Sequence, residues 1–83
     1  MFYAYVLKSE IKEYYYKGHC QNLTIRLQQH NAGKTKSIEH AIPFRLVYHE
    51  EFETRAAAIK REKYFKSAAG RKFIRKMLGS LPE

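Results

Sequence analysis

The segment FYAYVLKSEIKEYYYKGHC, residues 2–20, determines how this chain begins to fold. Phe2 to Leu7 is rich in aromatic and β-branched residues, and Tyr14 to His19 has the same character, so each stretch predicts a strand. The polar break from Ser9 to Glu13 is too short for the crossover that parallel strands require. The two strands should therefore form an antiparallel hairpin.

The register of this hairpin determines which side chains meet. A turn centred between Glu10 and Ile11 places Tyr5 directly opposite Tyr16. Facing residues of one pair lie about 5 Å apart at Cβ, on the same face of the sheet. The sequence therefore predicts a pair of neighbouring phenols.

A helix, a loop and a third strand follow the hairpin. Asn22 is a good N-cap for a helix to about Asn31, and Gly33 is suited to end it. We expect a polar loop over residues 34–42 and a strand over residues 44–52.

The last third of the chain predicts two helices. Thr54 caps the first, which runs to about Ser67. Gly70 marks the break, and Arg71 to Leu78 forms the second, a short basic helix. The elements expected from the sequence therefore follow the order β-β-α-β-α-α.

Length and composition limit the class of protein. The 83 residues predict a single domain, residues 1–83. The single cysteine excludes an internal disulfide framework. No apolar run reaches the roughly 18 residues of a membrane span, and no basic region precedes an apolar one at the N-terminus. We expect a cytoplasmic monomer without membrane contact.

Positive charge is concentrated in the C-terminal part. The net charge is +8, and residues 54–83 hold nine Lys/Arg against two Glu. Such a field attracts polyanions. The predicted phosphate-contacting residues are Lys34, Lys36, Arg71, Lys72, Arg75 and Lys76. The alternative is an ordinary solvated helical surface.

Glu62 is the acidic residue most suited to chemistry. On a helical wheel it shares a stripe with Ala58 and Phe65, the stripe expected to meet the sheet. A carboxylate there must be paired or bound to a metal. One carboxylate suits Mg²⁺, which keeps several waters and takes other contacts from phosphate oxygens. The alternative is a salt bridge to Arg55 or Lys66.

Four more side chains complete a candidate site. Tyr5 and Tyr16 could activate or orient a water if a cation stabilises the phenolate, although tyrosine is also simply a good strand residue. Arg26 could hold a phosphate oxygen, and His30, four residues later on the same helix, could donate to phosphate or relay a proton. The alternatives are a surface charge and a histidine at the core edge. His19, His40 and His49 show no ligand spacing and receive no role.

The chain resembles the small single-domain bacterial members of the GIY-YIG nuclease family. The first family motif corresponds to Tyr3-Ala4-Tyr5 and the second to Tyr16-Lys17-Gly18. Further similarity lies in Asn22-Leu23, Arg26-Leu27, His30-Asn31, Gly33-Lys34, Pro43, Leu46-Val47-Tyr48, Glu51-Phe52, Arg61-Glu62-Lys63 and Lys66-Ser67. The similarity covers residues 2–78, and it implies an α+β fold, a three-stranded antiparallel sheet flanked by helices.

The chain departs from the family pattern at several motif positions. Ala4 and Lys17 replace apolar motif centres, Tyr3 replaces a glycine, and Ile38 stands at a position that is often Thr or Ser. His19-Cys20 follows Gly18 in place of an aromatic-Thr pair.

The resemblance implies a nuclease site with defined roles. Tyr5 and Tyr16 would act on water or phosphate, Arg26 would bind phosphate, His30 would support catalysis, and Glu62 would hold Mg²⁺ or Mn²⁺. The expected activity is hydrolysis of phosphodiester bonds in nucleic acid, with DNA favoured over RNA.

Two further expectations concern partners and alternatives. Family members usually carry a separate DNA-binding domain, so we expect weak, salt-sensitive affinity here. A partner protein, or a nick, flap or branch in the DNA, would supply specificity. The alternative is a non-catalytic nucleic-acid-binding module with the same fold, and a protein-interaction domain is a third interpretation.

Overall fold

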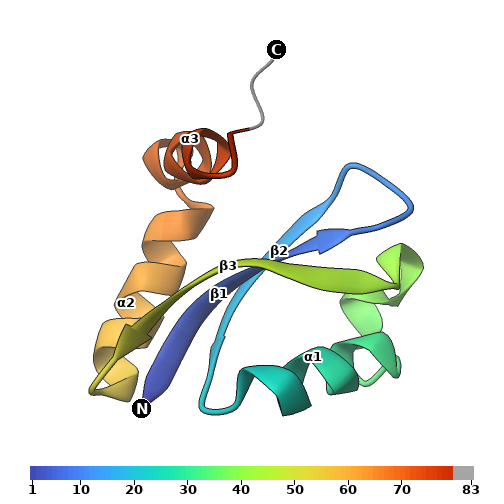
Figure 1. The fold of residues 1–83 in the computed structure, drawn as a ribbon, viewed down its shortest axis with the longest axis horizontal. Helices are drawn as coiled ribbons and strands as arrows, with labels where there is room; N and C mark the ends of the chain where they lie inside the picture. The colour runs from blue at the N-terminus through green and yellow to red at the C-terminus, as the bar shows by residue number, and fades with distance from the viewer. Residues whose placement is uncertain (80–83) are drawn as a thin grey trace.

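Three antiparallel strands form the centre of the fold (Figure 1). They are β1 (Phe2–Ser9), β2 (Tyr15–Cys20) and β3 (Phe44–Phe52), in the order β2-β1-β3. This computed structural model describes residues 1–79. The expected α+β architecture and element order are confirmed, and β2 is left as an edge strand.

The hairpin forms in a register two residues away from the expected one. Tyr5 pairs with Gly18, and Leu7 pairs with Tyr16. The Ser9 hydroxyl accepts hydrogen bonds from the backbone N–H groups of Ile11 and Lys12, which displaces the turn toward β2. Because side chains alternate along a strand, a shift of two keeps both tyrosines on one face.

Two helices begin at their expected caps. In α1 (Leu23–Asn31) the Asn22 side chain accepts from Ile25 N at 3.0 Å. In α2 (Arg55–Lys66) the Thr54 hydroxyl accepts from Ala57 N at 3.1 Å. Gly33 follows α1 with φ of 82°, a left-handed conformation that glycine adopts without cost.

The segment expected to be a loop contains a 3₁₀ helix, η1 (Lys36–Ala41). Ile38 is 2% exposed and Ala41 is fully buried. The polar composition of the segment concealed these two apolar residues, which pack beneath the sheet.

The break between the last two helices lies at Ser67 and not at Gly70. Ser67 Oγ donates to Tyr64 O and accepts from Gly70 N, so it ends α2 and caps α3 (Ala68–Met77). Gly70 lies inside α3, where a Cβ would stand 1.8 Å from Tyr64 O. The glycine therefore permits close contact between the two helices.

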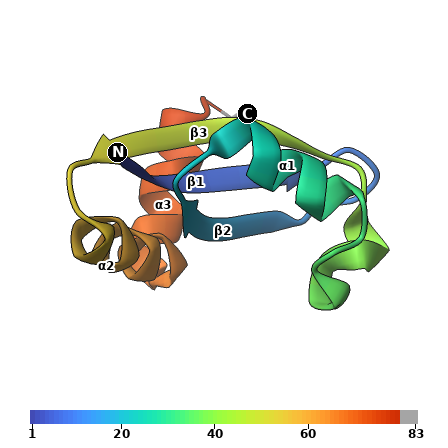
Figure 2. The same cartoon turned by 90° about the horizontal axis from the view of Figure 1, so that it is seen from below.

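The sheet separates two hydrophobic clusters, and helices lie on both of its sides (Figures 1 and 2). Helices α1 and η1 cover one face, where Tyr5 and Leu7 are buried. Helices α2 and α3 cover the other face, where Ala4 and Val6 are buried. Alternate residues of β1 thus pack into opposite hydrophobic clusters. Within the described residues, no helix has the length and apolar character to cross a bilayer.

Candidate active site

Three of the predicted site residues meet on the face covered by α1. The Tyr5 hydroxyl lies 2.8 Å from His30 Nε2. The ring centroids of Tyr16 and His30 are 4.9 Å apart, and those of the two tyrosines are 6.3 Å apart. The predicted neighbourhood of both phenols and the imidazole is therefore present, with Tyr16 beside Tyr5 along the sheet instead of directly opposite.

His30 is the buried centre of this group. It is 0% exposed, and its second ring nitrogen, Nδ1, lies 2.9 Å from Thr35 Oγ1. Burial lowers the pKa of His30, and the nearby Arg26 charge lowers it further, so the ring is neutral at pH 7. Tyr5, His30 and Thr35 form a continuous hydrogen-bonded chain. The sequence analysis missed Thr35, whose one available signal is its position two residues after Gly33.

The two tyrosines differ in their environment. Tyr5 is 1% exposed, and its ring crosses Gly18, where an added Cβ would stand 2.6 Å from the Tyr5 hydroxyl oxygen. Burial raises the pKa of Tyr5, although the neighbouring Arg26 guanidinium acts in the opposite sense. Tyr16 is half-buried and retains contact with solvent. Only Tyr16 can therefore reach a water molecule without rearrangement of the core.

Arg26 has hydrogen-bonding capacity that is not used. Its Nη1 donates to Gln29 Oε1 at 3.1 Å. Its Nε is buried and has no hydrogen-bond partner among the residues that the structure describes. A buried donor without an acceptor is costly, and such groups are often found where a ligand or ordered water supplies the acceptor. The arrangement is suited to a phosphate oxygen.

Glu62 lies apart from these four residues, on the side of the sheet covered by α2. Its Oε1 is 2.6 Å from His19 Nδ1, and its Oε2 is 2.6 Å from Lys66 Nζ. The side chain is 16% exposed, so it does not point into solvent. The salt bridge to Lys66, which is the alternative to a metal site, is formed. The sequence does not predict the contact with His19, because no local spacing relates His19 to Glu62.

The charge state of Glu62 follows from these donors. Burial alone would raise the pKa of this carboxyl, but hydrogen bonds from Lys66 and His19 outweigh burial and lower it. Glu62 is therefore a carboxylate at neutral pH, the form that binds divalent metals.

A hollow at the edge of β2 connects the two parts of the site. It has a volume of about 330 Å³ and contains Arg26 on one side and His19, the partner of Glu62, on the other. The complete lining is His19, Cys20, Gln21, Asn22, Ile25, Arg26, Gln29 and Arg55. Of the five predicted residues, Arg26 lines this hollow and Glu62 is linked to it through His19, so the five do not share a single pocket.

The donor set is compatible with a weakly held Mg²⁺ at Glu62. Within residues 1–79, no three His, Cys, Asp or Glu side chains gather closely enough to hold a metal ion. Mg²⁺ is commonly bound by one or two carboxylates, with waters and phosphate oxygens as its other ligands. Each oxygen of Glu62 accepts one hydrogen bond, from His19 or from Lys66, and a carboxylate offers about four lone-pair sites, so a coordination position remains.

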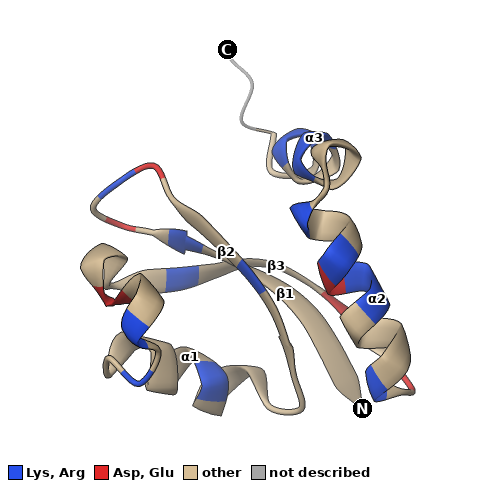
Figure 3. Cartoon of the chain, turned by 180° about the vertical axis from the view of Figure 1, so that it is seen from behind, with Lys and Arg blue, Asp and Glu red and all other residues tan. Residues whose placement is uncertain are grey.

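The predicted phosphate-contacting cations form two separate groups (Figure 3). Lys34 and Lys36 are exposed near η1, where Lys36 Nζ lies 3.8 Å from Glu39 Oε2. The other group consists of the exposed α3 residues Arg71, Lys72, Arg75 and Lys76. Since η1 and α3 lie on opposite faces of the sheet, these groups do not make one continuous surface.

Comparisons with known proteins show to which family the chain is similar. A family model described as the GIY-YIG catalytic domain matches residues 1–76. A UPF0213 protein of Streptococcus pyogenes serotype M5 is 40% identical over 65 residues, which are 77% of this chain and 70% of the relative. A UPF0213 protein of serotype M3 is 38% identical over the same shares.

A solved structure shows the same likeness. The solution NMR structure of the UPF0213 protein BH0048 from Bacillus halodurans has a TM-score of 0.55 and 26% sequence identity. The match covers 96% of this chain and 88% of that chain. The family model spans all five candidate residues, from Tyr5 to Glu62.

Proposed function

Because this chain belongs to the GIY-YIG family, whose domain is of the nuclease type, we propose that it is a divalent-metal-dependent endonuclease acting on DNA. The observation that carries the proposal is the hollow at the edge of β2. It brings Arg26, with its buried and unsatisfied Nε, to the same concave surface as His19, which holds Glu62. A phosphodiester in this hollow would have a guanidinium on one side and a carboxylate close to the other.

Tyr16 is the residue suited to take the proton from the attacking water. It reaches solvent, whereas Tyr5 is buried and hydrogen-bonded to His30. The oxygen of that water forms a bond to phosphorus as the bond to the leaving oxygen breaks. The water's proton passes to the Tyr16 oxygen while the phenolic proton passes to solvent, and the leaving oxygen takes up a proton from solvent. Tyr5 and His30 hold the position of the Tyr16 ring through ring contacts.

Arg26 offsets the charge that gathers on the phosphate oxygens during attack. A guanidinium presents several donors in a fixed plane, which suits a charge that develops over more than one oxygen. Mg²⁺ or Mn²⁺ bound at Glu62 would supply Lewis-acid stabilisation of the leaving oxygen. Glu62 contributes the negative charge that makes such binding favourable.

One observation favours a second candidate, a non-catalytic nucleic-acid-binding module. Both oxygens of Glu62 already accept hydrogen bonds from cationic or imidazole donors. If these contacts persist with substrate bound, the carboxylate serves only to hold α2 against β2.

Nicking of supercoiled and branched DNA in Mg²⁺ or Mn²⁺ tests the proposal. Glu62→Gln, which keeps the size of the side chain and removes its charge, should abolish nicking and retain DNA binding. Tyr16→Phe should do the same. Glu53→Gln is the matched control, because Glu53 is exposed and lies outside the hollow.

Two outcomes would reject the enzyme. One is the absence of nicking by the wild-type protein with either metal on either DNA. The other is nicking by Glu62→Gln at the rate of Glu53→Gln. In both cases salt-dependent binding would support the module.

A further inference from the structure

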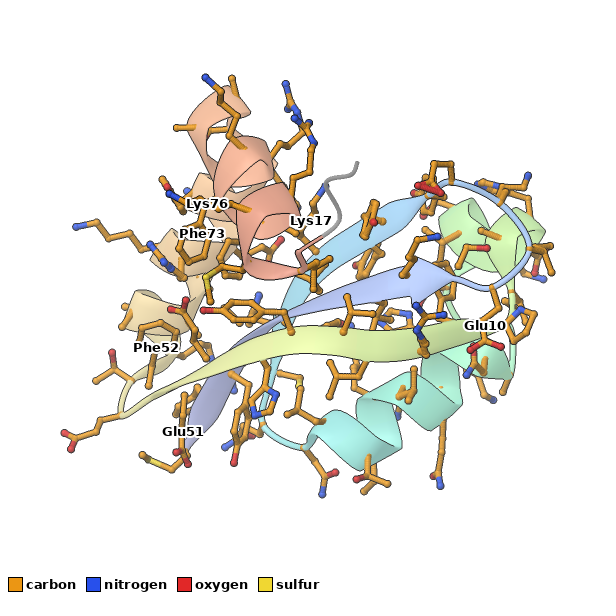
Figure 4. All side chains as sticks on the ribbon, turned by 45° about the horizontal axis from the view of Figure 1, so that its top comes forward. Glu10, Lys17, Glu51, Phe52, Phe73 and Lys76 are labelled. Carbon is orange, nitrogen blue, oxygen red and sulfur yellow. The ribbon has the colours of Figure 1, made fainter. Side chains whose placement is uncertain are left out.

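A second cavity lies between β2 and α3, on the face of the sheet opposite Tyr16. Its volume is about 350 Å³, and it is lined by Glu13, Tyr15, Lys17, Arg71, Ile74 and Arg75. Figure 4 shows Lys17 on β2 lying close to α3. None of the five residues in the proposed cleavage mechanism lines this cavity.

Three of the six lining residues are cationic, and they come from two elements. Lys17 projects from β2, and Arg71 and Arg75 lie one turn apart on α3. The single acid, Glu13, is at the rim with its side chain 82% exposed and its carboxylate 3.2 Å from Lys8 Nζ. Positive charge therefore predominates within the cavity.

The local field opposes the charge on Lys17. Partial burial lowers the pKa of Lys17, and the charges of Arg71 and Lys66 lower it further. An anion in the cavity would relieve this repulsion. Lys17 also stands where the related motif usually has an apolar residue, so the charge is not required to build the strand.

An apolar wall completes the cavity. The Tyr15 ring lies beneath two ammonium groups, Lys8 Nζ at 5.5 Å and Lys17 Nζ at 6.0 Å from its centroid. Ile74 lies beside it in the lining. Proteins that bind single-stranded nucleic acids combine an aromatic ring, on which a base stacks, with cations that contact the phosphates.

We propose that this cavity binds one nucleotide of a single-stranded nucleic-acid segment, with its phosphate between Lys17 and Arg71 and its base against Tyr15. A volume of this size suits a small ligand and cannot admit a duplex. The inference rests on the proposed function and specifies its substrate class. A DNA with a single-stranded branch could occupy both sides of β2, the duplex phosphate in the edge hollow and the free strand in the cavity.

Binding measured without metal tests the inference independently of cleavage. The probe is fluorescent (dT)₈ in EDTA, followed by anisotropy between 50 and 200 mM salt. Lys17→Gln and Arg71→Gln should each weaken binding about three- to tenfold and reduce the salt slope by about 0.7, the value for one lost phosphate contact on a single strand. Tyr15→Leu should weaken binding and leave the slope unchanged.

Helix α2 provides a matched control. Lys60 is exposed on α2 and does not line the cavity, so Lys60→Gln removes equal charge elsewhere. It should change affinity less than twofold. The Ile74 methyl resonances of the wild-type protein should shift with (dT)₈ and not with a blunt duplex.

Three results would overturn the inference. Equal weakening by Lys17→Gln and Lys60→Gln would show diffuse charge attraction. Equal Ile74 shifts with blunt duplex, or no shift with (dT)₈, would exclude a single-stranded ligand in the cavity. Because EDTA removes the metal, the assay measures binding alone. A protein that does not cleave DNA can still bind (dT)₈ in the cavity, and an active nuclease can still show no binding there.

Discussion

At the scale of single residues, Gly18 determines where the Tyr5 hydroxyl lies. The Tyr5 ring passes over the glycine to reach His30, and the space is already filled. A 1 Å displacement in a catalytic group can reduce rates about a hundredfold. The smallest residue of the second motif thus positions a side chain of the first motif.

We predict that Gly18→Ala disrupts the site more than the fold. The new Cβ would meet the Tyr5 hydroxyl oxygen at 2.6 Å, and the buried ring cannot swing away freely. Nicking should fall about a hundredfold, and the free energy of unfolding in urea should fall by about 1–3 kcal/mol. In a Tyr5→Phe background, which removes the nearest clashing atom, the alanine should cost less. An equal cost in both backgrounds would contradict this account.

Residue-level sequence reasoning was accurate where neighbours lie close in the chain. His30 lies one helical turn after Arg26, and the two tyrosines come from one hairpin. Local periodicity was therefore enough to place Arg26 beside His30 and Tyr5 near Tyr16. The partner of Glu62 is 43 positions away in His19. No periodicity relates these residues, because their contact depends on how α2 docks against β2.

At the scale of elements, the close contact of α2 and α3 depends on Gly70. The sequence suggested a break at this glycine because glycine weakens helices. The structure instead uses the missing Cβ for close packing against the Tyr64 carbonyl. Propensity cannot distinguish these two uses, because the second depends on a tertiary contact.

Gly70→Ala should therefore destabilise the protein, although alanine is the better helix former. The added methyl would stand 1.8 Å from Tyr64 O, which is backbone and cannot rotate away. We expect the free energy of unfolding to fall by about 3 kcal/mol, at the upper end for overpacking. The control Ala69→Gly, at an exposed helix position, should lose only about 1 kcal/mol. Unfolding in urea, followed by circular dichroism, measures both changes.

The polar segment before β3 shows the same limit of element-level prediction. Its residues are mostly hydrophilic, yet Ile38 is as fully buried as core residues of the strands. Only the position of η1 beneath the sheet explains this, and that position is set by the chain on both sides. Capping signals at Asn22 and Thr54, by contrast, act within one turn and were predicted correctly.

At the scale of the whole molecule, stability should fall on acidification in two stages. The pKa of His30 is lowered from 6.5 by burial and by Arg26, so only the unfolded chain binds this proton as the pH falls below 6.5. The pKa values of Glu50 and Glu62 are lowered from 4.5, so their contribution is lost only when the pH falls further, below about 4.5.

Thermal unfolding from pH 8 to pH 2 tests this assignment. His30→Gln should remove the first stage of the decline and leave the second. His40→Gln, on an exposed part of η1, should leave both. Persistence of the first stage in His30→Gln would assign it to another group.

Alternate side chains of β1 point to opposite faces of the sheet, so the sheet divides the interior into two separately packed compartments. Tyr5 belongs to one compartment, and Ala4 and Val6 belong to the other. Substitutions that retune the α3 side for a different ligand can accumulate without repacking the opposite compartment. The packing around Tyr5 and the ligand preference of the α3 side can then diverge independently, whether by natural selection or by protein engineering, whereas Glu62 shares the α3 side of the sheet.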